Sequence, residues 1–360
     1  MGFIKVYQKL RTRTGESNWT ILYIVSAIFQ MLVSIAIEAV ILRLNESSTT
    51  QLTSLAPMYD NATNRQFSHK MYNYSNYRTQ YLSIIDGNVW FMVIETFLTA
   101  LCISALFFQN TIEIISIGII NILLLFFAGT QAFQSNMWID HINDQLELDH
   151  ATTRFSKNVV TWEAIQLLIL TAFAVNSIFL GYKLYKQFGW NIYKRIGANI
   201  KTQRMYRTYL VFILLLKLDV FLLMGFQILN LIFLFGDPFG NTRTIIFQSI
   251  MVVIVIPVVA LALWGVRTEN TIAMIICFLA SVVTIINFIY ILAQFIIERD
   301  ENLLTLLDIL GIVLTVLSIL VAYLAHSNFG SGLKDHFQKR NHDGAVNLEA
   351  DPRKRFSIDD

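Results

Sequence analysis

The sequence is poor in the residues that mark a soluble, disordered or disulfide-linked protein. Only 14% of its 360 residues are charged, against roughly 25% in ordinary soluble domains, and it has four prolines and two cysteines. Cys102 and Cys277 both lie inside apolar runs, where they are expected to be small buried hydrophobic residues and not disulfide partners. The formal net charge of +2 is too small to indicate a nucleic-acid-binding protein.

Enzyme motifs are missing as well. The sequence contains no zinc-protease, nucleotide-binding-loop, serine-hydrolase, paired-cysteine or dinucleotide-binding pattern. Asp219 and Asp308 lie in apolar runs of opposite direction, as the aspartates of an intramembrane protease would, but at different depths. The acidic segment 134–158 lacks the spacing of metal ligands. We therefore expect no enzymatic activity, no catalytic residue, no cofactor and no metal site.

Apolar residues, in contrast, make up 55% of the chain and gather in long runs. A transmembrane helix needs about 20 such residues to cross about 30 Å of hydrocarbon. The pattern predicts an all-α polytopic membrane helix bundle with about eight transmembrane helices, over 21–41, 89–109, 114–133, 159–182, 209–235, 244–266, 271–297 and 303–325. A cytosolic segment, 1–20, precedes this bundle of 21–325, and a polar tail, 326–360, is expected to be cytosolic and disordered.

The positions of the basic residues predict that both chain ends face the cytosol. With the N-terminus inside, the predicted cytosolic segments hold eighteen of the 27 Lys and Arg residues, and the opposite side holds eight. This count disfavours a seven-span receptor with an external N-terminus. The polar loop 42–87 then faces the lumen, as a small cap or as a tether. It carries three predicted glycosylation sites, Asn45, Asn61 and Asn73.

The predicted cytosolic loop 183–208 is basic and contains no acidic residue. Within it Phe188, Ile192, Ile196 and Ile200 recur every four residues, which is typical of an amphipathic helix lying on a membrane surface. Its cations are predicted to contact anionic lipid headgroups of the cytosolic leaflet; they are Lys183, Lys186, Lys194, Arg195, Lys201, Arg204 and Arg207. The alternative is that these charges only fix the topology.

Four charged residues lie well inside the predicted spans, where a charge costs roughly 2.5–3.5 kcal/mol at the helix centre. Glu95, Lys217, Asp219 and Asp308 are predicted to form an intramembrane polar network. Lys217 and Asp219 are two residues apart and face opposite sides of their helix, so Glu95 is the expected partner of Lys217. Such a network would carry protons or bind a substrate. Alternatively, it would be a structural pair that fixes helix packing. A third alternative is that the charged side chains extend to the membrane surface from the end of an overlong span.

The stretches Tyr185–Gly197, Arg204–Tyr209 and Leu216–Asp219 resemble a family of uncharacterised Golgi-apparatus membrane proteins of yeasts and filamentous fungi. The resemblance covers about a third of the chain, around its fourth to sixth spans. It implies a fungal endomembrane protein and supplies no activity or binding residues.

These patterns favour a non-enzymatic binding or scaffold protein that presents its basic loop to lipids or trafficking partners. The alternative is a transporter of protons, ions or small solutes that uses Glu95, Lys217 and Asp219. The expected location is the Golgi membrane, with another endomembrane or the plasma membrane as alternatives. The expected partner is the lipid bilayer, including anionic lipids, and not nucleic acid.

Overall fold

The computed structural model of the protein describes residues 17–60, 65–148, 157–196, 200–236, 242–298 and 302–330. These ranges are almost entirely helical and contain no strand. The helices are α2 (Asn18–Asp60), α3 (Arg65–Phe108), α4 (Thr111–Leu148), α5 (Asn158–Ile196), α6 (Ile200–Leu218), the π-helix η1 (Asp219–Leu223), α7 (Met224–Gly236), α8 (Thr242–Thr268), α9 (Thr271–Glu298) and α10 (Asn302–Ser327). Most of the predicted N-terminal segment, 1–16, and of the tail, 331–360, lies outside the described residues.

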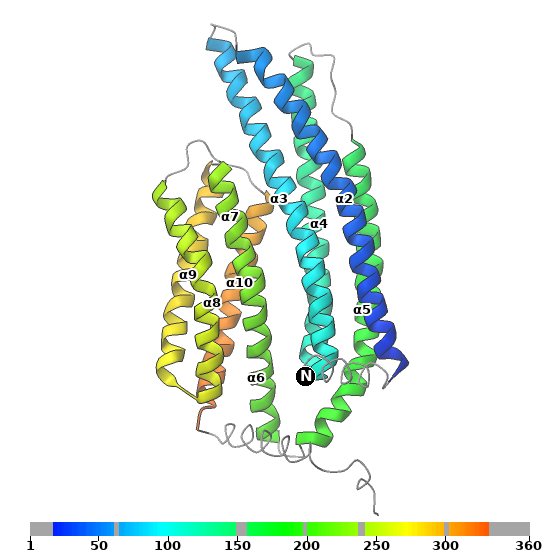
Figure 1. The fold of residues 1–360 in the computed structure, drawn as a ribbon, viewed down its shortest axis with the longest axis vertical. Coiled ribbons are helices and arrows are strands. Elements are labelled where there is room, and N and C mark those ends of the chain that lie inside the picture. Colours follow the sequence, from blue (N-terminus) through cyan, green and yellow to red (C-terminus); the bar gives the residue numbers. More distant parts are fainter. Residues whose placement is uncertain are drawn as a thin grey trace, which may run out of the picture.

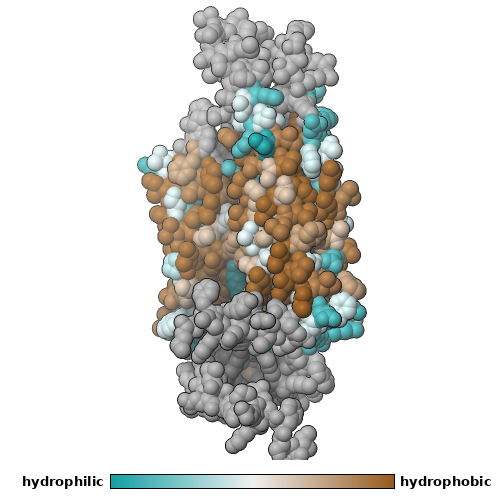
Figure 2. Space-filling view, turned by 45° about the vertical axis from the view of Figure 1, so that its right-hand side comes forward, coloured by the Kyte–Doolittle hydropathy of each residue, from teal (hydrophilic) through white to brown (hydrophobic). Residues whose placement is uncertain are grey.

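Within the described part of the chain, eight helical stretches are long and apolar enough to cross a membrane, with α6, η1 and α7 together forming one of them. This confirms the predicted all-α bundle. Large apolar side chains such as Leu168, Val253 and Ile272 are 70–73% exposed, as expected for a surface that faces lipid and not water. Figure 2 shows this apolar surface as a brown belt between hydrophilic patches toward the two ends.

An even number of spans places the start of α2 and the end of α10 at the same end of the bundle, the lower end in Figure 1. We call this end the base and the opposite end the top. The base is the side that the charge pattern predicts to be cytosolic.

The first helices are much longer than the apolar runs that predict them. α2, α3 and α4 contain 43, 44 and 38 residues, which is about 57–66 Å at 1.5 Å per residue. The expected polar loop 42–87 is therefore mostly helix, and so is the first part of the acidic segment 134–158. In this polar part of α2 the hydroxyls of Ser48, Thr49 and Thr50 donate to backbone carbonyls one turn earlier, so their hydrogen bonds are made within the helix.

The helices form two halves that lie side by side (Figure 1). In the first half α2 and α4 each pack against both α3 and α5, which makes a four-helix bundle. In the second half α10 packs against α9, α6 and α7, and α8 packs against α9 and α7. The halves meet where α3 contacts α7 and where α4 contacts α6 and α10.

The hairpins α3–α4 and α8–α9 both turn at the base, and both have the same turn geometry. Gln109 and Glu269 adopt positive φ angles of 52° and 56° and end α3 and α8. The next residues, Asn110 and Asn270, cap the following helices, because each side-chain Oδ1 accepts a hydrogen bond from the backbone amide two residues on, at 3.1 and 2.9 Å. These caps allow α4 and α9 to begin immediately, so each hairpin needs almost no loop.

Candidate functional site

Helices α2 to α5 each contribute one buried polar side chain to a layer around Glu95. Gln30 Nε2 of α2 donates to the Glu95 carboxylate of α3 at 3.2 and 3.3 Å and to Asn121 Oδ1 of α4 at 2.7 Å. Asn121 Nδ2 in turn donates to Ser177 Oγ of α5 at 3.3 Å. None of the four side chains is more than 7% exposed. We call these residues (Gln30, Glu95, Asn121 and Ser177) the Glu95 layer.

The same four helices form a second layer nearer the top, around Glu38 of α2. Gln166 Nε2 of α5 donates to Glu38 Oε2 at 2.5 Å, and Gln131 Nε2 of α4 donates to Glu38 Oε1 at 3.4 Å. Gln131 also donates to Asn88 Oδ1 of α3. These four residues (Glu38, Asn88, Gln131 and Gln166), all at most 3% exposed, make up the Glu38 layer.

Buried polar side chains also lie between the two layers and beyond the second. Ser34, 1% exposed, lies on the same face of α2 as Gln30 and Glu38, one turn of about 6 Å from each. Ser135, one turn after Gln131 on α4, donates to Glu163 Oε1 of α5 at 2.6 Å. The Glu95 layer, Ser34, the Glu38 layer, Ser135 and Glu163 thus form a polar ladder that extends about 21 Å along the bundle, the length of the 14 residues from Asn121 to Ser135 on α4.

A small cavity, about large enough for one water molecule, adjoins the Glu95 layer. Besides members of that layer, its polar lining comes from Tyr23, Ser26, Thr99 and Cys102. Tyr23 and Ser26 precede Gln30 on α2 and Thr99 and Cys102 follow Glu95 on α3, so the cavity lies toward the base. The ladder therefore has space for about one water molecule at its lower end.

The carboxyl groups of the ladder are held by neutral groups. The hydrogen bonds given to Glu38, Glu95 and Glu163 come from glutamine amides and one serine hydroxyl. Among the described residues, the ion pairs are Lys157–Asp140 and Lys217–Glu113, neither of which belongs to the ladder. Because an unbalanced charge in a low-dielectric interior is costly, each of these carboxyl groups needs a proton or another cation to balance it.

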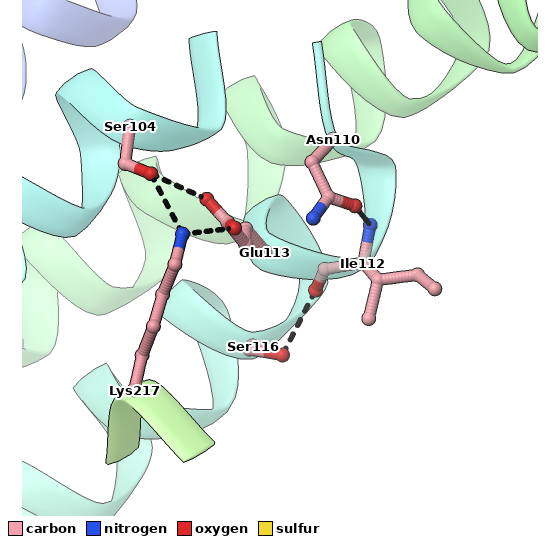
Figure 3. Close-up of polar contacts among 6 residues, drawn as sticks. All are labelled: Ser104, Asn110, Ile112, Glu113, Ser116 and Lys217. Carbon is pink, nitrogen blue, oxygen red and sulfur yellow. Dashed lines mark hydrogen bonds and ion pairs between the residues drawn. The ribbon is translucent and has the colours of Figure 1, made fainter. Parts of the chain in front are cut away.

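Lys217 is paired with Glu113, not with the expected partner Glu95. Lys217 Nζ lies 2.6 Å from Glu113 Oε1 and 2.9 Å from Ser104 Oγ, and Ser104 donates to the other carboxylate oxygen at 3.1 Å (Figure 3). Glu113 lies in the first turn of α4, at the base, where α4 contacts α6. The pair joins the two halves of the bundle, and Glu95 instead accepts hydrogen bonds from Gln30 of α2.

Asp219 and Asp308 have separate partners within the second half. Asp219, the first residue of η1, accepts a hydrogen bond from Ser318 Oγ of α10 at 2.9 Å. Asp308 of α10 accepts one from Asn230 Nδ2 of α7 at 2.8 Å. The four charged residues that the sequence suggested as one network therefore belong to four different clusters.

The basic loop is largely an extension of two transmembrane helices. α5 continues to Ile196 and α6 starts at Ile200, and Phe188 is only 1% exposed within the main apolar core. The first part of the expected surface helix is thus the end of a membrane-spanning one, and Figure 1 shows the lower end of α5 turned toward the base of α6. The side chains of Lys194, Arg195 and Lys201 lie outside the described residues.

The described cations of this region lie at the base, two of them against aromatic rings. Lys183 Nζ lies 5.4 Å from the centre of the Trp19 ring and 5.5 Å from that of Phe179, and Lys186 Nζ lies 4.6 Å from that of Tyr182. Such pairs are typical of the zone between hydrocarbon and headgroups. Two further predicted lipid contacts, Arg204 and Arg207, are exposed at the start of α6.

The predicted glycosylation sites differ in their placement. Asn45 lies inside α2 with a side chain that is 0% exposed, and not in the exposed loop that the sequence suggested. Asn61 lies outside the described residues, and Asn73 lies in α3 with a side chain outside them. Glycosylation at Asn61 and Asn73 stays a prediction.

Sequence reasoning found Glu95 but missed most of the ladder. Glu38 and Glu163 lie within about one turn of the lumenal ends of their apolar runs, where a carboxylate can face headgroups, and the amide side chains inside the runs carry no charge that would mark them. One signal was available: Gln30, Ser34 and Glu38 recur every four residues, which places them on one face of a helix.

The chain is similar to a protein that is named for its location in the Golgi apparatus membrane. The chain is 22% identical over 271 residues to a UPF0658 Golgi apparatus membrane protein of Schizosaccharomyces pombe, and the match covers 67% of this chain and 74% of the relative. The predicted resemblance to the uncharacterised fungal Golgi membrane proteins is confirmed. Together with the eight apolar helices, the match also confirms a multispan protein of the Golgi membrane. No family model and no solved structure matches the chain.

Proposed function

We propose that the protein moves protons across the Golgi membrane through the polar ladder of α2 to α5, alone or coupled to a small solute. The observation that carries this proposal is the arrangement of Glu95, Glu38 and Glu163 in series, each hydrogen-bonded by neutral side chains only. Chains of buried carboxyl groups in membrane helices typically mark proton pathways.

The ladder supplies the chemical groups that a proton pathway needs. The carboxyl groups can each hold a proton, while the hydroxyls of Ser34 and Ser135 and water in the small cavity can pass one on. The glutamine and asparagine amides orient the carboxyl groups but do not carry protons themselves. Lys217 and Asp219, the other members of the transporter expected from the sequence, lie outside this pathway.

The proposal is tested with the full-length protein reconstituted into liposomes that contain a pH-sensitive dye. A potassium diffusion potential set by valinomycin supplies the driving force. We expect a proton flux above that of empty liposomes, and we expect Glu95→Gln and Glu38→Gln each to lower it at least tenfold, because a glutamine cannot accept and release a proton.

The matched control is Glu46→Gln, which makes the same chemical change on an exposed face of α2, eight residues after Glu38. It should leave the flux unchanged. A wild-type protein with no flux, or glutamine variants that conduct like the wild type, would refute the proposal. Size-exclusion profiles of the purified variants separate loss of flux from loss of folding.

A second candidate function, the binding or scaffold role, is supported by the cations at the base. Lys183 and Lys186 lie against aromatic rings at the place where headgroups are expected. A Lys183→Glu/Lys186→Glu variant should retain fewer anionic lipids on purification and lose its Golgi location, with proton flux unchanged. Arg43→Glu, an exposed change of the same charge nearer the top of α2, is the control. Unchanged lipid retention and location would exclude this role for the two lysines.

A further inference from the structure

A second group of buried polar side chains lies near the top of the other half, outside the proposed proton pathway. Asn230 of α7, Gln248 of α8 and Asp308 of α10 each lie six residues, about 9 Å, from the upper end of their helix. They therefore share one depth although they are far apart in the sequence. Gln227 lies one turn from Asn230 on α7.

Two contacts make two pairs of these residues, and one turn of α7, from Gln227 to Asn230, places the pairs next to each other. Asn230 Nδ2 donates to Asp308 Oδ1 at 2.8 Å, and Gln248 Nε2 donates to the backbone carbonyl of Gln227 at 3.5 Å. None of the four residues is more than 2% exposed. We call Gln227, Asn230, Gln248 and Asp308 the upper polar cluster.

The upper polar cluster contains several polar atoms without a partner. Asp308 Oδ2, Asn230 Oδ1 and both polar atoms of the Gln227 side chain make no hydrogen bond. A buried polar atom without a partner destabilises the folded protein, so such groups are rare unless a water or an ion meets them. Three of the four atoms are oxygens, one of them from a carboxylate.

We propose that the upper polar cluster binds a small monovalent cation. Hard cations prefer oxygen ligands, and carboxylate and amide oxygens are the ligands that this cluster leaves without a partner. The single carboxylate of Asp308 balances one positive charge, which favours an alkali-metal ion over a divalent one. No described basic side chain forms an ion pair with Asp308, so the cluster has no internal counterion.

The proposal is tested by thermal unfolding of the purified full-length protein in detergent. Sodium, potassium or lithium chloride is titrated against N-methylglucamine chloride at constant total salt. We expect a saturable rise in the unfolding temperature with at least one alkali-metal ion, because a ligand that binds only the folded state stabilises it. An equal response to all salts, or no response, would overturn the proposal.

Two variants locate the effect. Asp308→Asn should abolish the cation dependence, and Gln227→Leu, which preserves bulk but removes the amide oxygen, should raise the half-saturating concentration at least tenfold. Asp219→Asn is the matched control, since this buried carboxyl of the same half bonds to Ser318 instead, and it should keep the wild-type response. If Asp308→Asn and Gln227→Leu both respond like the wild type, the site is refuted.

This inference does not depend on the proposed proton pathway. The measurement reads cation binding through stability and not through transport, so a protein that conducts no protons can still show it. Conversely, Glu95→Gln and Glu38→Gln lie in the other half and should leave the cation response intact.

Discussion

Lys217 of α6 and Glu113 of α4 form an ion pair of 2.6 Å that joins the two halves of the bundle at its base. The Glu113 side chain is 2% exposed and that of Lys217 is 33% exposed, so the pair is only partly screened by solvent. Ser104 of α3 bonds to both partners and holds them in place. One contact thus ties together three helices that belong to different halves.

Loss of either partner should loosen the junction. We expect Glu113→Gln and Lys217→Gln each to lower the free energy of unfolding by about 1–3 kcal/mol, because each leaves a charge in a poorly hydrated position. Thermal unfolding of both single variants and of the double variant completes a double-mutant cycle. The double variant should lose less than the sum of the singles. Additive losses would mean that the two groups do not interact.

Gly225 of α7 lies against the Trp90 ring of α3. A Cβ atom at this position would overlap the Trp90 ring, so Gly225→Ala requires the ring or the helix to move. We expect a loss of about 1–3 kcal/mol in unfolding free energy. Gly129→Ala on α4 is the control, because its Cβ would meet nothing within 4 Å and the change should be neutral or stabilising. Equal effects of both changes would contradict the close contact.

The asparagine caps of the two base hairpins should contribute equally. Asn110→Ala and Asn270→Ala each remove the hydrogen bond to the first turn of the following helix, and each should cost about 1 kcal/mol. Because the hairpins belong to different halves, the two losses should add in the double variant. Replacement by Ser or Asp, which also cap helices, should restore most of the stability measured by thermal unfolding. Alanine variants as stable as the wild type would show that the caps are not needed.

The placement of Asn45 leads to a clear expectation for glycosylation. Its side chain is 0% exposed inside α2, which leaves no space for a glycan in the folded protein. We expect Asn45→Gln to leave the gel mobility of the protein from fungal cells unchanged. Asn61→Gln and Asn73→Gln are the comparison, and the sequence predicts a mobility shift for each. A shift for Asn45→Gln would mean that α2 is open around this residue in the membrane.

The positions of the membrane-spanning helices could be predicted from the sequence. Each apolar run marks a helix because only a helix satisfies its own backbone hydrogen bonds in hydrocarbon, and the predicted spans agree with the observed helices wherever the chain is apolar. The helix ends in polar regions could not be predicted, since α2 and α3 continue through residues whose hydropathy indicates a loop.

Partner choice among polar groups was decided by the tertiary structure. Depth along a helix can be counted from the sequence, and this placed Glu95 within reach of Lys217. Which helices are neighbours cannot be counted in this way: α3 places Glu95 beside Gln30 of α2, and α6 places Lys217 beside Glu113. The structure also shows that the hairpins at Asn110 and Asn270 share one capping hydrogen bond, between the side-chain Oδ1 and the backbone amide two residues on.

The sequence by itself thus determined which eight stretches of the described chain are long and apolar enough to cross a membrane, because this property depends on composition and length alone. Only the tertiary structure decided that amides and carboxyl groups from four separate helices meet in two layers. Hydrogen bonds act over about 3 Å between residues up to 128 positions apart, and helix packing alone brings such residues together.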